Sequence, residues 1–579
     1  MHRKSGRTAR FESLGPGGHV NDRPAHRRLG PRFKALLPAL VFATALSIAL
    51  VYGSKIVFTG GLREIGFSSV SIKPFAVTDV LWVAVLSVLL TLITSRVPGV
   101  YEWLLDRGMK PSSVTDRKQR TLLHAAASGG MAIAWLPMLL TYAPGGLNAD
   151  ALFSIKQALY AGTSIGWDNH HPVLYALFLQ PMLELGARLG SINLGMLIAT
   201  VVQYIIMAGV LGYSVVWLAK QRAPVAFVIS TAAFYALFPT FAIFAVTLSN
   251  DSLFAALILL YSLHLVDVIR SDGQLLNGAR GIATFIVLGL LLIFCRNNGV
   301  LVVALAGLTL AGVYRMRTKL LYPALIGIFV VTAIVQGPVY DMMSVNKPLV
   351  EALGIPLQQM GYVVVTGGDI SAKDKVFIDS LLPAEEWALH YSPSTVDPLK
   401  AKDGIDKRYL SQNKKLFATT WLSLLYKNPE AYVQSYMLET FGYWKPVIGR
   451  AGVSLPLMTN NKIGIHRTDL IERATGRTLG PLFDSMTRSK IWRTLLNIGV
   501  TIWLAFLSAA ALFSLKKGRY TIALTPLLGC WLALMIAAPI AFTYRYLLMF
   551  VICLPLALLL PLIASADSDA ELADQSAVL

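Results

Sequence analysis

A succession of long apolar segments is the feature that most restricts how this chain folds. We count twelve that approach or exceed the length needed to cross a bilayer core. They are residues 35–53, 78–95, 122–142, 194–218, 224–246, 251–268, 281–294, 299–313, 320–336, 492–514, 521–541 and 547–563. Hydrophobic residues make up 55% of the sequence and charged residues 14%, which excludes an ordinary water-soluble domain. The sequence therefore predicts an all-α polytopic membrane protein with about 12 transmembrane helices.

The net charge of +19 follows from basic residues that gather beside these segments. The basic stretches are residues 1–34, 96–120, 220–222, 315–319 and 516–519. Basic connectors stay in the cytoplasm, and alternate crossings bring all five there if residues 172–190 form an interfacial helix rather than a span. We expect a multi-pass protein of the bacterial cytoplasmic (inner) membrane with both termini cytoplasmic. The lipid bilayer, and no nucleic acid, is the partner that this charge pattern indicates.

The spans divide the chain into five parts. We expect a disordered basic tail (1–34), an N-terminal transmembrane module (35–336) with an outer loop of interfacial helices (143–193), and an extracytoplasmic domain (337–490). C-terminal transmembrane helices (491–563) and a disordered cytoplasmic tail (564–579) follow. The outer domain is predicted to be mostly helical, with helices at 374–381, 384–389, 414–426 and one that opens at Asn428-Pro429-Glu430.

Asp150 lies in the outer loop that follows the third span. Asn148 and Asp150 both stand where a helix begins, so one interpretation is a helix cap. The other is a general base whose pKa is set by the membrane edge.

Asp168, His170 and His171 place a second carboxylate and two imidazoles in one short stretch. They suit sugar binding or a divalent cation (Mg²⁺ or Mn²⁺) with Asp150, Asp168 and His171 as ligands, or a simple turn with polar caps. Apart from that cation, no cofactor is predicted. Cys295, Cys530 and Cys553 lie in or beside apolar segments, so neither a disulfide framework nor a cysteine zinc site is expected.

Two arginines fall within apolar surroundings and need anions. Arg296, followed by Asn297, interrupts one long apolar stretch, and Arg545 lies between two tyrosines before the last span. Each arginine either pairs with an acidic residue of a neighbouring span or holds a phosphate of a lipid-linked substrate. Asp251, at the outer end of another span, is interpreted as a helix-capping residue.

These features together resemble the GT-C superfamily of polytopic glycosyltransferases. The resemblance rests on the acidic residue of the first large outer loop, the helix opened by His171-Pro172, the broken helices that carry Arg296, and Arg545-Tyr546. Ile355-Pro356-Leu357-Gln358-Gln359 and Tyr391-Ser392-Pro393 are similar to an uncharacterised bacterial membrane family, domain of unknown function 6020.

The GT-C resemblance implies transfer of a sugar from a polyprenyl-phosphate donor to a cell-envelope glycan, lipid or protein on the extracytoplasmic face. Asp150 and Asp168 would then be catalytic, and His170, His171, Arg296, Asn297 and Arg545 would bind substrate. A transporter or flippase of lipid-linked sugars is the alternative. It would use the same arginines, and His264 with Asp267 could form its proton relay.

Overall fold

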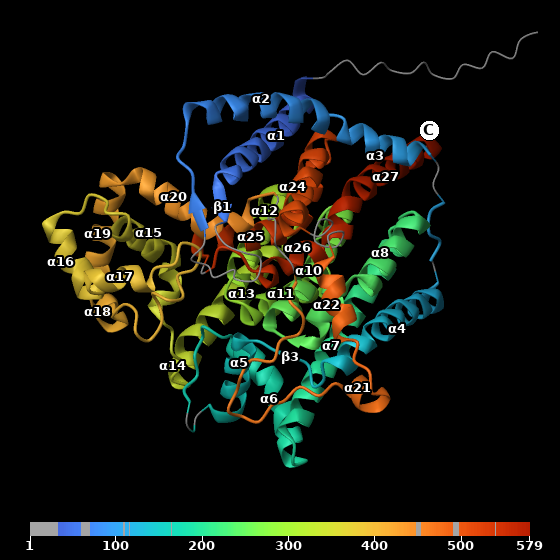
Figure 1. Cartoon of the computed structure of the whole chain (residues 1–579). Helices are drawn as coiled ribbons and strands as arrows, with labels where there is room; N and C mark the ends of the chain where they lie inside the picture. The colour runs from blue at the N-terminus through green and yellow to red at the C-terminus, as the bar shows by residue number, and fades with distance from the viewer. Residues whose placement is uncertain are drawn as a thin grey trace, which may run out of the picture.

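The computed structural model of the chain describes residues 33–58, 70–107, 110–114, 116–161, 163, 165–446, 453–489, 497–538 and 540–578. Within these ranges the chain is almost entirely helical, with two short strand pairs (Figure 1). The all-α multi-pass class is thus confirmed. Most of the predicted basic tail, residues 1–32, lies outside the described residues.

Eight helical stretches in the described ranges are long and apolar enough to cross a membrane. They are built from α1 (Phe33–Ser54), α2 (Val77–Thr94) with α3 (Val97–Asp106), α4 (Arg117–Thr141), α7 (Ile192–Lys220), α10 (Asn250–Arg270), α13 (Leu321–Ile334) with η4 (Val335–Val339) and α14 (Tyr340–Met342), η7 (Gly518–Leu524) with α25 (Thr525–Ala537), and η8 (Tyr544–Leu547) with α26 (Leu548–Ile552) and the first part of α27 (Leu554–Val578), as far as Ala566. Each coincides with one of the predicted apolar segments.

One further apolar segment of the described chain is a bent helix pair, which is either a broken span or a re-entrant loop. Helices α8 (Val225–Leu237) and α9 (Pro239–Val246) meet at an angle of 53°. Phe238 between them is extended, the conformation that a following proline favours. The break therefore follows from Pro239, whereas the apolar pattern predicts one uninterrupted span over residues 224–246.

Three further predicted spans are helices shorter than 18 residues. They are α11 (Ala279–Cys295), α12 (Gly299–Tyr314) and α24 (Ile498–Ser514). Eight long stretches, or nine with the broken pair, are therefore found in the described part. The count of twelve stays a prediction.

The segment after α14 forms a helical group with its own apolar core, at the left of Figure 1 in yellow and orange. Its members are η5 (Leu349–Leu353), α15 (Gly354–Val365), α16 (Ala372–Leu381), α17 (Ala384–His390), α18 (Lys407–Gln412), α19 (Lys414–Lys427) and α20 (Pro429–Thr440). Trp387, Leu399 and Leu424 are fully buried in that core. The four helices predicted in this segment are all present.

The chain then folds back over the start of the outer loop. Met458 pairs with Leu147 and Thr468 with Ala143, and the short helices α21 (Leu470–Thr475) and α22 (Gly480–Arg488) follow. The outer loop itself carries α5 (Ala149–Tyr160) and α6 (Val173–Arg188), which pack against each other, and α6 also packs against α7. Helix α6 has 16 residues and is not among the long stretches, as predicted for residues 172–190.

Short elements connect the helices. β1 (Ile56–Phe58) and β2 (Val70–Ile72) form an antiparallel pair, and β3 (Gly146–Leu147) and β4 (Thr247–Leu248) a parallel pair. The remaining short turns are η2 (Gln274–Asn277), η3 (Arg315–Arg317) and η6 (Phe441–Tyr443).

The basic connectors come together in pairs. The main-chain nitrogen of Val225 donates to the carbonyl of Lys110, so the first two internal basic stretches adjoin. Arg317 and Arg519 lie on either side of Asp272, which joins the other two. The proximity of these basic stretches agrees with alternate crossings that bring them to one face. The orientation of the termini stays a prediction. Helix α27 extends to Val578, into the tail of residues 564–579. The disorder of this tail stays a prediction.

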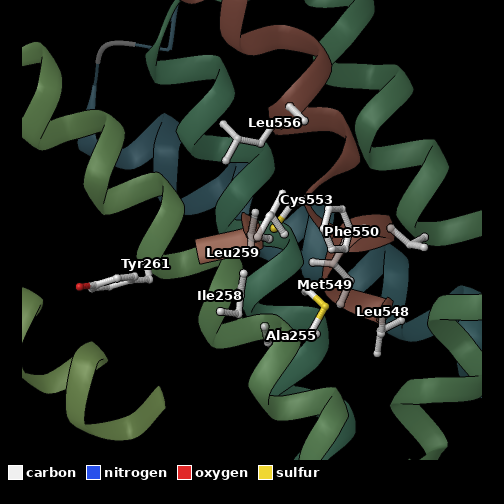
Figure 2. Close-up of a cluster of buried hydrophobic side chains, with 14 of the residues drawn as sticks. Ala255, Ile258, Leu259, Tyr261, Leu548, Met549, Phe550, Cys553 and Leu556 are labelled. Carbon is white, nitrogen blue, oxygen red and sulfur yellow. The ribbon is translucent and has the colours of Figure 1, made fainter. Parts of the chain in front are cut away.

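Helix α10 lies at the centre of the main core. Ala255, Ile258 and Leu259 pack beside Met549 and other apolar residues of α26, as Figure 2 shows. This buried contact fixes the start of α10 relative to η8, which immediately precedes α26. Both of those positions carry residues of the candidate site.

Candidate functional site

Two helices of the site begin in the same way. Leu147 of β3 lies opposite Leu248 of β4, and each strand leads directly into a helix. Asp150 follows Leu147 by three positions, and Asp251 follows Leu248 by three. The parallel strand pair therefore places two carboxylates in the first turns of neighbouring helices.

Other residues cap these helices. The side chain of Asn148 accepts a hydrogen bond from the main-chain nitrogen of Ala151 at 2.8 Å, and Ser249 accepts one from that of Asp251 at 3.1 Å. The capping interpretation thus belongs to Asn148 and Ser249. The carboxylates of Asp150 and Asp251 are available for other partners.

Those partners are the two predicted arginines. The guanidinium of Arg545 forms an ion pair with Asp150 and lies 3.8 Å from Oδ2 of Asp251. Arg296, at the end of α11, pairs with Oδ1 of Asp251. The result is a chain of alternating charges, Asp150–Arg545–Asp251–Arg296, drawn from four separate helical segments.

Burial differs along this chain. The side chain of Asp251 is 3% exposed and that of Arg296 14%, whereas Asp150 is 35% exposed. Asp251 and Arg296 therefore form the inner, buried end, where each charge has the other as its partner. Asp150 and Arg545 form the end that an outside molecule can reach.

Tyr546 orients both guanidinium groups. Its ring lies 4.4 Å from Cζ of Arg296 and 4.9 Å from Cζ of Arg545, and its hydroxyl is 3.3 Å from Nη2 of Arg545. The ring face attracts both cations without neutralising them. Tyr546 thus keeps two like charges close together beside the carboxylates.

The electrostatic setting keeps Asp150 ionised. Burial opposes its ionisation, but the charge of Arg545 and the hydrogen bond that it donates hold the pKa of Asp150 below its ordinary value. The imidazole of His171, by contrast, is held in its neutral form. Burial, aided by His170, lowers the pKa of His171 to about 4, so its ring is neutral near pH 7 and stacks on Phe153.

The outer helical segment contributes a second charged group. Nδ1 of His170 lies 3.4 Å from Oε2 of Glu351, and the ammonium of Lys400 lies 2.5 Å from the same oxygen. Burial disfavours the charge on Glu351, yet Lys400 lowers the pKa of this carboxyl below its ordinary value. Burial raises the pKa of Asp397, and the charges of Glu351 and Asp150 raise it further. Two carboxyl groups near His170, Asp150 and Asp397, are thus shifted in opposite directions.

A buried polar network lies within the outer helical segment. Gln358 donates to Oε2 of Glu439 at 2.8 Å and to the carbonyl of Ser392 at 2.7 Å. Burial raises the pKa of Glu439 well above its ordinary value and so favours the neutral form of this carboxyl. Ser394 then accepts from the main-chain nitrogen of Ala541, which ties the outer segment to the chain just before η8.

The remaining predicted residues lie in the loop beside this site. Asp168 accepts from Asn346 at 3.0 Å and from the main-chain nitrogen of His170 at 2.7 Å, as in a polar turn. Asn297 donates to the carbonyl of Asn169 at 3.0 Å, so the break between α11 and α12 contacts the histidine loop. Among the described residues, no group of three or more His, Cys, Asp or Glu side chains is arranged to hold a metal ion. The structure thus does not gather Asp150, Asp168 and His171 into a ligand set.

Sequence reasoning missed several residues of the site. Asp251 was treated as a cap, although an acidic residue at the outer end of a span is itself a signal. Tyr546 was assigned to the site only as a neighbour of Arg545. Glu351 gave no local signal, because its proximity to His170 depends on how the outer segment packs.

The sequence model of a family of unknown function, DUF6020, matches residues 163–575, well over half of the chain. The chain is a member of the DUF6020 family. The range shared with DUF6020 includes Asp251, Arg296 and Arg545 and begins after Asp150. No curated protein and no solved structure matches the chain.

Proposed function

We propose that this protein is an integral-membrane glycosyltransferase of the GT-C type, which transfers a sugar from a polyprenyl-phosphate donor. The observation that carries the proposal is the exposed end of the charge chain. There, a half-buried carboxylate and a guanidinium at the membrane edge face outward beside a helical segment that can cover them. A base and a phosphate-binding group at one point are what a glycosyl transfer from a lipid phosphate requires.

Arg545 would change partner when the donor binds. A phosphodiester carries one negative charge and can therefore replace one carboxylate. Of the two arginines, Arg545 is the one whose carboxylate partner, Asp150, is more exposed. Transfer of Arg545 from Asp150 to the phosphate removes the cation that lowers the pKa of Asp150. The carboxylate then becomes a stronger base at the moment when the donor is in place.

The reaction follows from that arrangement. Asp150 takes the proton of an acceptor hydroxyl while the hydroxyl oxygen bonds to the anomeric carbon. The bond from that carbon to the phosphate oxygen breaks, and its electron pair leaves with the polyprenyl phosphate, which Arg545 and Arg296 stabilise. The sugar configuration is inverted. The acceptor is an envelope glycan, lipid or protein held between the outer loop and residues 337–490, on the extracytoplasmic face of the inner membrane.

The carrier lipid gives the most direct test. The full-length protein is purified, its bound lipids are extracted, and polyprenyl-phosphate sugars are sought by mass spectrometry. We expect such lipids in the wild-type protein and a loss of at least tenfold in Arg545→Gln. Arg317→Gln, which removes an exposed arginine paired with Asp272, is the matched control and should retain them. Absence of these lipids from folded wild-type protein would count against the proposal.

A flippase would bind the same lipid, so a second measurement separates the two functions. Sealed vesicles that contain the protein and labelled donor are supplied with an envelope fraction. A transferase releases polyprenyl phosphate and labels the acceptor. Movement of intact donor across the bilayer without cleavage would instead indicate transport.

A further inference from the structure

A cavity of about 440 Å³ lies between the beginning of α4 and the end of α7. Helix α4 contributes Arg117, Arg120, Thr121 and His124 to its wall, and α7 contributes Tyr213, Val216, Trp217 and Lys220. Helix α4 has 25 residues and therefore spans about 37 Å at 1.5 Å per residue. Its other end leads to the outer loop with Asp150, so the cavity and the candidate site lie at opposite membrane faces.

The three basic side chains of this cavity are not neutralised within the described part of the chain. Arg117, Arg120 and Lys220 form no salt bridge with any carboxylate there, and Arg120 donates to the main-chain oxygen of Asp116 at 3.4 Å. The nearest acidic residue of α10, Asp267, is bound instead by the side-chain nitrogens of Trp217 and Gln221, each at 3.1 Å. The cavity therefore has an excess of positive charge.

The surroundings are those of a lipid headgroup rather than of bulk solvent. Tyr213, which is 44% exposed, supplies an aromatic side chain of the kind that favours the membrane interface, whereas Trp217 is buried in the cavity wall. Leu122, which follows the lining residue Thr121, is 60% exposed on the surface of α4. The amino-terminal end of α4 adds its positive helix dipole next to Arg117. Arginine forks bind phosphate oxygens through paired hydrogen bonds.

We propose that this cavity binds the headgroup phosphate of an anionic glycerophospholipid. The phosphate lies among Arg117, Arg120 and Lys220, and the acyl chains follow the apolar surface beside Leu122. Basic cavities between transmembrane helices at one membrane face are a recurrent means of selecting anionic lipids. This site does not depend on the proposed transferase activity.

The test compares lipid binding by two variants that lose the same charge. One carries Arg117→Gln, Arg120→Gln and Lys220→Gln. The other carries Lys118→Gln, Lys319→Gln and Lys516→Gln, which removes three exposed lysines from the predicted cytoplasmic connectors and leaves the cavity unchanged. Full-length proteins in detergent are titrated with phosphatidylglycerol and with phosphatidylcholine, and bound lipid is counted by native mass spectrometry.

We expect the wild-type protein and the lysine control to retain phosphatidylglycerol over phosphatidylcholine, and the cavity variant to lose that preference about a hundredfold, on the scale found for three basic residues. A cavity variant with Arg117→Lys and Arg120→Lys should keep most of it, which shows that the fold is intact. Equal phosphatidylglycerol binding in the cavity variant and the control would overturn the proposal. Displacement of phosphatidylglycerol by equimolar inorganic phosphate would also overturn it, because the occupant would then be a free anion.

Discussion

The carboxylate of Asp150 and the guanidinium of Arg545 form an ion pair although 395 positions separate them in the sequence. The pair joins the outer loop to the turn before α26. Because Arg545 also lies 3.8 Å from Asp251, and Asp251 pairs with Arg296, this contact is the exposed end of a longer network. Substitutions at its two ends should therefore have different effects.

At the exposed end, Asp150→Asn should abolish chemistry while leaving the fold nearly intact. Loss of a general base lowers turnover by about a hundredfold or more. Asn148→Ala is the control, because it removes the helix cap at a cost of about 0.5–2 kcal/mol in stability and keeps the base. Sugar transfer and thermal unfolding are measured for both. An Asp150→Asn protein that transfers sugar at the wild-type rate would remove this residue from the mechanism.

At the buried end, Asp251→Asn should destabilise the protein strongly. It leaves the guanidinium of Arg296 buried without its charged partner, a loss of about 3–5 kcal/mol. Asp272→Asn breaks an exposed pair with Arg317 and should cost at most about 1 kcal/mol. Reaction of the three buried cysteines with a thiol dye during heating reports unfolding of both variants. Equal melting temperatures would show that the buried network does not support the fold.

The neutral ring of His171 should make stability depend on pH. Its pKa is about 4 in the folded protein and near 6.5 when unfolded, so the unfolded chain binds more protons between these values. Stability contributed by the neutral ring is complete above pH 6.5 and falls as the pH decreases toward 4. His171→Gln should remove this part of the slope in unfolding measured from pH 4 to 7. His170→Gln should leave most of it, because burial is the main cause of the lowered pKa of His171 and His170 contributes less. An unchanged slope in His171→Gln would contradict the assignment.

The alternate crossings of the membrane predict which membrane face each connector occupies. Ser380 is exposed in the outer helical segment, and Ser113 is exposed beside α4. In intact cells an impermeant thiol reagent should modify Ser380→Cys and spare Ser113→Cys, while the native cysteines are buried. The reverse pattern would invert the topology and move the candidate site to the cytoplasmic face.

The local parts of this fold could be predicted from sequence because their causes are local. Pro429 and Glu430 mark the start of α20 as expected. Asn428 precedes them, but its side chain bonds to the main chain of Asp369 rather than capping the helix. The bond between Asn428 and Asp369 depends on how distant segments pack, so the sequence carries no signal for it.

The site divides in the same way. Arg296 and Arg545 could be recognised because a cation in an apolar segment needs an anion. The identity of the anion depended on how α10 packs against α11 and α26, and the anion proved to be Asp251. The prediction that Arg296 pairs with an acidic residue of a neighbouring span is therefore confirmed. The binding of a phosphate by Arg296 stays a prediction.

The pairing of β3 with β4 has a consequence for how this site can change. The spacing of Asp150 and Asp251 is set by main-chain pairing at Leu147 and Leu248, not by the side chains that perform the chemistry. Residues around the two carboxylates can therefore be exchanged while the gap between them is preserved. Selectivity toward different substrates can diverge at this position without a new backbone having to evolve.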